Sequence, residues 1–142
     1  MKEQSFRNHS RYVFLYHFVT LPITVAVIVG SIINLTHSSK ENLYSASLLV
    51  IISFLIGSIG LFARQFALKA QDRAIRAEEN VRHFILTGKP LDSRLRMGQI
   101  IALRFAPDEE FPSLCQQAAD KGLRNADIKK AIQSWRADHY RA

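Results

Sequence analysis

The stretch GLFARQFALKAQDRAIRAEE, residues 60–79, passes from apolar into charged sequence with no proline and no glycine after Gly60. Proline and glycine are the residues that most often end a helix. Their absence predicts that one helix continues through this boundary, and the next pair of such residues, Gly88 and Pro90, places its end near Thr87.

Two long apolar stretches precede this boundary. Residues 12–39 and 42–63 hold 28 and 22 residues, respectively, without Asp, Glu, Lys or Arg. About 20 apolar residues suffice to cross a bilayer. We therefore predict transmembrane helices at 12–35 and 43–63, joined by a short outer loop at 36–42.

A cleaved signal peptide is the alternative for the first stretch, but its apolar centre is typically only about 7–15 residues long. A buried soluble hairpin would need more covering chain than 142 residues supply.

The formal charge of +7 is divided unevenly. Residues 1–11 carry a net +2, the loop carries none, and residues 64–142 carry +5. Basic residues accumulate in the cytoplasmic flanks of spans. Both ends of the chain are therefore expected in the cytoplasm, and the single cysteine suits that reducing compartment.

Aromatic and basic side chains mark the predicted cytoplasmic interface. Aromatic rings at this depth place an apolar body in lipid and a polar tip among headgroups, and basic residues near the surface attract anionic lipids. His17 is also a candidate proton site, as an ionisable group within a span. The predicted interface and headgroup residues are Arg11, Tyr12, Tyr16, His17, Arg64, Lys69 and Arg73.

Small residues recur at helical spacing in both predicted spans and beyond. Ala26, Gly30 and Asn34 form a stripe in the first span, for which the second span is the simplest partner. In the second helix, alternating steps of three and four keep small residues on one side of a supercoiled helix. We call this set the seam: Ala46, Leu49, Ser53, Ile56, Gly60, Ala63, Ala67, Ala70, Ala74, Ala77, Val81 and Phe84. Either the C-terminal part or another copy of the chain would cover it. Alternatively, alanine is frequent here because it favours helices.

Residues 64–87 then form a cytoplasmic stalk helix, and residues 88–142 a small bundle of about three helices. The stalk carries the acidic-first pairs Asp72/Arg76, Glu78/Arg82 and Glu79/His83 at i, i+4, which support a solvated helix. The bundle helices are expected from Asp92 or Ser93 to about Phe105, from about Phe111 to Lys121, and from a cap at Asn125 through Trp135. Gly122 supplies a left-handed helix end with Leu123 as its contact.

No catalytic constellation is visible, and we expect no cofactor and no metal. The five histidines share no ligand spacing, and Cys115 lies on an apolar helix face as a small core residue. The basic final helix has a helix-turn-helix rhythm, but an ordinary capped helix pair explains it, so we do not expect nucleic-acid binding. Trp135, Arg136 and Tyr140 form an Arg-aromatic group of the kind found at protein contacts, although packing of Trp135 into the bundle is the favoured alternative.

The strings NHSRYVFLYHF, RQFALKAQDRAIRAEENVRHF, LTGKPLDSRLRMGQIIALRFA and DIKKAIQSWRADHYR carry a resemblance over nearly the whole chain. It resembles an uncharacterised family of small bacterial two-span membrane proteins, known only as a domain of unknown function. The resemblance implies a helical two-span protein of a bacterial inner membrane, and it supplies no activity, ligand or catalytic residue to carry over.

The sequence thus predicts an all-α integral membrane protein, in contact with the lipid bilayer. The leading hypothesis is a non-enzymatic membrane-anchored scaffold or accessory protein that binds an unidentified protein partner. The alternative is a subunit of a homo-oligomeric channel or transporter, although neither predicted span holds Asp, Glu, Lys or Arg. A lipid-modifying enzyme is the third hypothesis and lacks a visible acid, base or nucleophile set.

Overall fold

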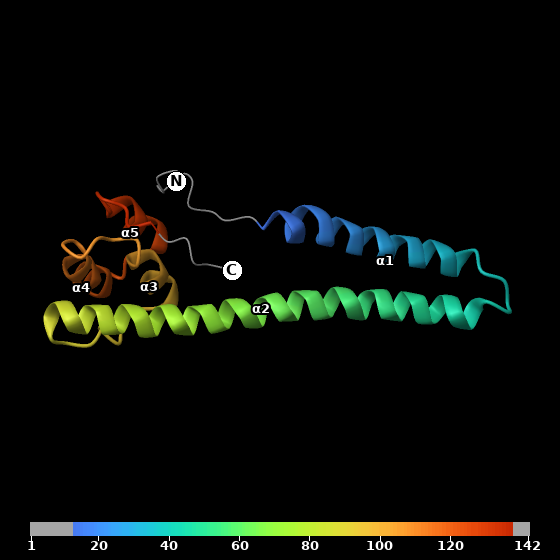
Figure 1. Cartoon of the computed structure of the whole chain (residues 1–142), viewed down its shortest axis with the longest axis horizontal. Coiled ribbons are helices and arrows are strands. Elements are labelled where there is room, and N and C mark those ends of the chain that lie inside the picture. The colour runs from blue at the N-terminus through green and yellow to red at the C-terminus, as the bar shows by residue number, and fades with distance from the viewer. Residues whose placement is uncertain (1–12, 138–142) are drawn as a thin grey trace. The chain divides into compact units, whose positions relative to one another are not determined.

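The computed structural model describes residues 13–137, and its elements there are all helical (Figure 1). The chain divides into two units, residues 13–67 and 68–137, which are described separately. In chain order the elements are a π-helical turn, η1, at Leu15–Thr20, α1 at Leu21–Thr36, α2 at Leu43–Thr87, α3 at Met97–Leu103, α4 at Phe111–Lys121 and α5 at Asn125–Ala131.

Helix α2 confirms the prediction that the apolar stretch and the charged stretch form one helix. It runs without interruption from Leu43 to Thr87 and passes from one unit to the other after Ala67. Gly88 follows in the left-handed region, with φ of 72°, and its N–H donates to the Phe84 carbonyl at 2.8 Å. Glycine adopts this conformation without a steric penalty. The helix therefore ends where the sequence places its first glycine after Gly60.

In the first unit, η1 and α1 run alongside the N-terminal half of α2 (Figure 1). The segments Leu15–Thr36 and Leu43–Thr87 are both long and apolar enough to cross a membrane. The π turn ends two residues before Pro22, which cannot donate to the carbonyl four residues earlier. The Thr20 hydroxyl donates to the Leu15 carbonyl at 3.0 Å, and the Thr24 hydroxyl donates to the Thr20 carbonyl at 2.8 Å. Threonine hydroxyls thus bind backbone carbonyls on the turn before the proline.

The two apolar helices meet through small and polar residues. The hydroxyl oxygens of Ser31 and Ser53 lie 3.1 Å apart in a hydrogen bond. A Cβ on Gly57 would stand 3.4 Å from the Thr24 methyl carbon and 3.7 Å from Cδ1 of Ile28. Glycine therefore allows close approach at this point. The contact follows the face of α1 that holds Thr24, Ile28 and Ser31.

In the second unit, the three short helices α3, α4 and α5 form a bundle on the C-terminal part of α2. The core joins Ile75 of α2 to the bundle, and Leu103, Phe111 and Ile128 are 0% exposed. The other buried core residues are Leu95, Ile100, Ala102, Phe105, Ala106, Leu114, Cys115, Ala118 and Ile132. This burial of apolar side chains is the main favourable contribution to folding of the bundle.

The end of α4 is organised by Gly122 and by a buried glutamine from α3. Gly122 has φ of 60°, and the Leu123 N–H donates back to the Ala118 carbonyl at 3.3 Å, as the glycine and the following leucine predict. The Gln99 amide donates to the carbonyls of Ala118 and Leu123 at 3.2 and 2.9 Å, and its oxygen accepts from the Arg96 N–H at 2.8 Å. Gln99 is 3% exposed, so one side chain satisfies three backbone groups across the bundle.

Two of the expected bundle helices are shorter than the sequence suggests. Helix α3 begins at Met97 rather than at Asp92 or Ser93, because the Asp92 carboxylate binds the Arg94 N–H and side chain within a turn. Asn125 is the first residue of α5 rather than its cap, and Ile132 is extended, with ψ of 120°. Trp135 therefore lies beyond α5. Its ring packs 5.0 Å from that of Phe105, whose carbonyl accepts from the Arg136 N–H at 2.8 Å.

Candidate functional site

Arg82 of α2 is the polar centre of the contact between the stalk and the bundle. Its guanidinium donates to Glu79 Oε2 at 3.0 Å, to Asp108 Oδ1 at 2.7 Å and to the Ala106 carbonyl at 2.8 Å. The guanidinium carbon lies 4.2 Å from the ring centre of Phe111, a cation–π distance. The side chains of Arg82 and Glu79 are only 12% and 9% exposed. This cluster fixes the bundle to one side of α2.

The expected i, i+4 pairs of the stalk are not formed among the described residues. Glu79 pairs with Arg82, three residues later, rather than with His83. The His83 ring nitrogen instead lies 2.8 Å from the Lys89 carbonyl. Contact with the bundle redirects these side chains, because buried partners offer stronger interactions than exposed i, i+4 pairs.

A groove runs along the exposed side of α2 next to this cluster. It encloses about 670 Å³. Its floor is apolar, and Ile85 is 76% exposed, Val81 57% and Leu86 40%. Charged side chains form its rim. The lining residues are Ala77, Glu78, Glu79, Val81, Arg82, Ile85, Leu86, Asp108 and Arg136. An apolar floor with a charged rim suits an apolar helix or peptide rather than a small polar substrate.

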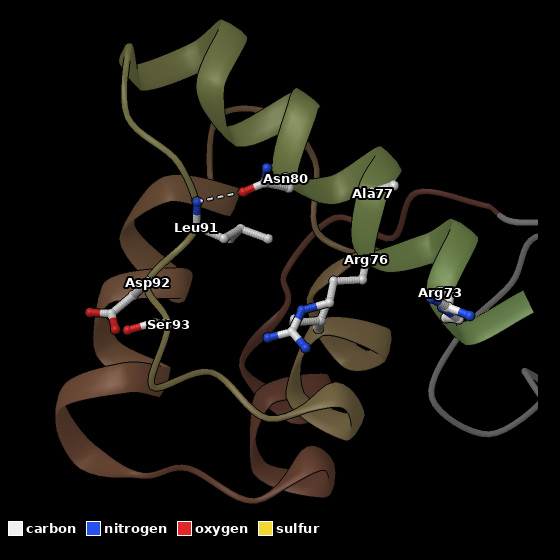
Figure 2. Close-up of a pocket in the computed structure, with 8 residues that line it drawn as sticks. Arg73, Arg76, Ala77, Asn80, Leu91, Asp92 and Ser93 are labelled. Atoms are coloured by element: carbon white, nitrogen blue, oxygen red, sulfur yellow. Dashed lines mark hydrogen bonds between the residues drawn. The ribbon is translucent and has the colours of Figure 1, made fainter. Parts of the chain in front are cut away.

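A second hollow, of about 530 Å³, lies between α2 and the segment that follows it (Figure 2). The Leu91 N–H donates to Asn80 Oδ1 at 2.9 Å and holds the segment against the helix. Arg76 extends into the hollow, whereas Asp92 points away from Arg76 (Figure 2). The Arg94 guanidinium beside Asp92, 2.6 Å away, lowers the pKa of that carboxyl to about 2. Arg76 forms no ion pair with any residue between 13 and 137, so the hollow presents a positive charge.

Three of the predicted interface residues meet in the first unit. The Arg64 guanidinium carbon lies 4.9 Å from the ring centre of Tyr16, and the His17 ring packs edge-on against Tyr16 at 5.1 Å. The His17 ring nitrogen lies 2.9 Å from the Val13 carbonyl. Lys69 and Arg73 are exposed on α2, and Arg11 and Tyr12 lie outside the described residues.

The seam residues do not share one environment. Ser53 is 4% exposed and Ala46 1%, whereas Gly60, Ala63, Ala67, Ala70, Ala74 and Ala77 are all exposed. Ala26 and Gly30 are exposed as well, so the expectation that their stripe faces the second apolar helix differs from the structure. The Ser31–Ser53 hydrogen bond and Gly57 favour the neighbouring face of α1 instead.

The predicted contact group at the C-terminus is separated by the structure. Trp135 is half-buried against the bundle core. Arg136 is exposed and lines the groove, and Tyr140 lies outside the described residues. Glu110 holds this part of the chain, since its carboxylate accepts from the N–H groups of Gln133 and Ser134, both at 3.1 Å.

Sequence reasoning missed the three polar residues that organise the bundle. Asp108 and Glu110 lie in the acidic run before α4, where local sequence suggests only a helix start, but they bind Arg82 and the segment after α5, respectively. Nothing in the local sequence indicates the structural role of Gln99, because its hydrogen-bond partners lie 19 and 24 residues away along the chain. Among residues 13–137, no group of three histidine, cysteine or acidic side chains is placed to hold a metal ion.

Cys115 is expected to be chemically inert in the folded protein. It is 2% exposed, and burial together with the charge of Glu79 raises the pKa of its thiol from 9.0 to about 12. The reactive thiolate is therefore about a thousandfold scarcer at pH 8. Maleimide labelling at pH 8 should be at least a hundredfold slower than in denaturant, where burial is lost. Rapid labelling of the folded protein would instead support a nucleophilic role.

These features define a small all-helical protein with two helices long and apolar enough to cross a membrane, and a bundle packed on the end of the second. The chain belongs to DUF6526, a family of unknown function whose model matches residues 1–142. No curated protein and no solved structure matches the chain significantly.

Proposed function

We propose that this protein is a non-enzymatic scaffold or accessory protein, anchored in the bacterial cytoplasmic membrane by two spans, with residues 68–137 as a cytoplasmic module that binds another protein. The observation that carries the membrane anchor is the apolar outer surface of the helices in residues 13–67. Phe18 is 60% exposed, Val25 59%, Leu55 55% and Ile59 65%. Soluble proteins rarely expose contiguous apolar surface on this scale, whereas lipid covers it without cost.

The orientation is supported by charge and by the Tyr16–Arg64 contact. Residues 1–11 and 64–142 are both basic, while the loop carries no net charge. Basic residues favour the cytoplasmic side. The cation–π contact joins Arg64, just after the second apolar stretch, to Tyr16, near the start of the first, and such basic and aromatic pairs are typical of a membrane interface.

A binding role is supported because several polar groups of the module are bonded within its own fold, whereas an apolar groove stays open. Arg82 and Gln99 are buried and bonded within the fold, and both carboxylate oxygens of Glu110 bind backbone. The module leaves open an apolar groove beside α2, with Val81 and Ile85 on its floor. Exposed apolar surface with a charged rim is typical of protein contacts.

The topology can be tested with single-cysteine variants in a Cys115→Ala background. Ser38→Cys lies in the loop, and Ser113→Cys lies exposed on α4. On intact bacterial spheroplasts, a membrane-impermeant maleimide should label the variant Ser38→Cys and not Ser113→Cys, and both should react after permeabilisation. Labelling of Ser113→Cys before permeabilisation, or release of the protein by alkaline carbonate, would overturn the proposal.

The scaffold and channel hypotheses are separated by conductance. Purified protein in planar bilayers should give no single-channel currents, because neither apolar stretch carries Asp, Glu, Lys or Arg to line an ion path. Reproducible currents that are abolished by replacing an exposed polar residue of a span, as in Asn34→Leu, would favour the channel subunit.

A further inference from the structure

The open side of α2 in residues 68–87 has the pattern of a coiled-coil seam. In heptads, Ala74 and Val81 take position a, and Ala70, Ala77 and Phe84 take position d. All five are exposed, Val81 and Phe84 each to 57%. Positions a and d are those that a partner helix covers in a coiled coil.

The bundle occupies the opposite side of the same helix. Ile75 and Arg82 take position b, and Glu79 takes position f, the outward positions of a coiled coil. Ile75 is 5% and Glu79 7% exposed, and the Arg82 side chain is 12% exposed. The chain's own bundle thus covers the outward positions and leaves the inward ones free, so α2 can hold the bundle and a further helix at once.

We propose that a second copy of this chain packs in parallel and in register on Ala70, Ala74, Ala77, Val81 and Phe84. This inference rests on the proposed function, because insertion in one membrane with one topology gives two copies the same direction. Alanine at three of the five positions allows close approach of the helices, and Val81 and Phe84 contribute most of the buried apolar area.

Charge complementarity selects this partner and this orientation. Arg73 takes position g and Glu78 takes position e, five residues later. In a parallel pair, position g of one helix meets position e of the next heptad on the other, so Arg73 meets Glu78 of the second copy twice by symmetry. An antiparallel pair would bring like charges together. Neither Arg73 nor Glu78 forms an ion pair within residues 13–137, so both are free for this contact.

The groove beside Arg82 continues this surface. Ile85, at position e, is 76% exposed beside Val81 on the groove floor. In the parallel pair, position g of the second copy lies against Ile85, and that position is the uncharged Asn80. The exposed isoleucine therefore meets an uncharged neighbour.

The test is the mass and the dissociation constant of the full-length protein in detergent micelles, by light scattering with detergent subtracted and by dilution. A dimer is expected. Ala74→Glu together with Val81→Glu should abolish it, while Gln117→Glu together with Ala126→Glu, exposed on α4 and α5, should leave it unchanged. Arg73→Glu or Glu78→Arg should weaken the dimer about tenfold, and the double swap should restore it to within about threefold. Trp135 fluorescence verifies that each variant retains a folded module.

Cysteine cross-linking reports the orientation. In a Cys115→Ala background, Ala70→Cys should form a disulfide dimer on mild oxidation, because equivalent d positions meet only in a parallel, in-register pair. Lys69→Cys, one residue earlier and outside the seam, should not. A monomer at all concentrations, a dimer that survives the Ala74→Glu/Val81→Glu change, or a failed charge swap would overturn the inference. A monomer with the expected cysteine topology would refute the dimer and leave the membrane anchor standing.

Discussion

Replacing Arg82 with methionine is expected to lower the free energy of unfolding of the module by about 3–5 kcal/mol. Methionine keeps much of the aliphatic volume, so the loss comes from the guanidinium. Without it, the Glu79 carboxylate is left charged, 9% exposed and without its partner 3.0 Å away. Asp108 is 60% exposed and contributes little, because water screens it. Urea unfolding in detergent micelles, followed by the fluorescence of Trp135, the only tryptophan, measures the change.

Two further variants show whether the unpaired charge of Glu79 is responsible for the loss of stability in Arg82→Met. Arg76→Met, an exposed arginine on the same helix, should change stability by less than about 0.5 kcal/mol. Adding Glu79→Gln to Arg82→Met should recover part of the loss, since a neutral amide is less costly to bury than a carboxylate. A loss below about 1 kcal/mol in the single variant would show that Arg82 does not hold the bundle to the stalk.

The second large effect is expected at Gln99, for which Gln99→Met should cost about 3 kcal/mol. Methionine has a similar length but no strong hydrogen-bonding groups. The carbonyls of Ala118 and Leu123 and the N–H of Arg96 would lose their contacts of 3.2, 2.9 and 2.8 Å. The same urea titration of Trp135 fluorescence applies, because the ring packs on Phe105, in the same core as α3.

Gln117→Met is the matched control, because Gln117 lies exposed on α4. Its expected effect is within about 0.5 kcal/mol. Equal effects of the two substitutions would mean that the three backbone groups find water or other partners when Gln99 is removed, and that this glutamine is not needed to join α3 to the end of α4.

Much of the helical architecture could be predicted from local sequence. The continuous helix α2, its end at Thr87 and Gly88, and the left-handed end of α4 at Gly122 all follow from proline, glycine and apolar spacing. The boundaries of the bundle helices were less accurate. Asp92 binds Arg94 in a turn, so α3 begins later than predicted. The backbone is extended at Ile132, and Trp135 beyond it packs on Phe105. Both differences from the predicted boundaries result from specific side-chain contacts, which intrinsic helix propensities do not take into account.

The partners of the polar side chains could not be predicted in the same way. The sequence suggested Glu78/Arg82 and Glu79/His83 from spacing alone, yet Arg82 binds Glu79 and reaches Asp108, 26 residues away. The stripe of Ala26 and Gly30 had the correct spacing for close packing, but the serine hydrogen bond and Gly57 place Thr24 and Ile28 in the contact. A pattern of small residues shows where a helix can approach, and not which face it uses.

The sequence by itself determined an all-helical chain with two apolar helices, the second extending into charged sequence, because helix periodicity, capping and apolar length are local properties of the chain. Only the tertiary structure decided which side of α2 the bundle covers and which side it leaves open. Ile75, Glu79 and Arg82 on one side, and Ala74, Ala77 and Val81 on the other, are equally compatible with a helix. The choice depends on where Asp108, Ala106 and Phe111 meet Arg82, and residues this far apart in sequence come together only when the chain folds.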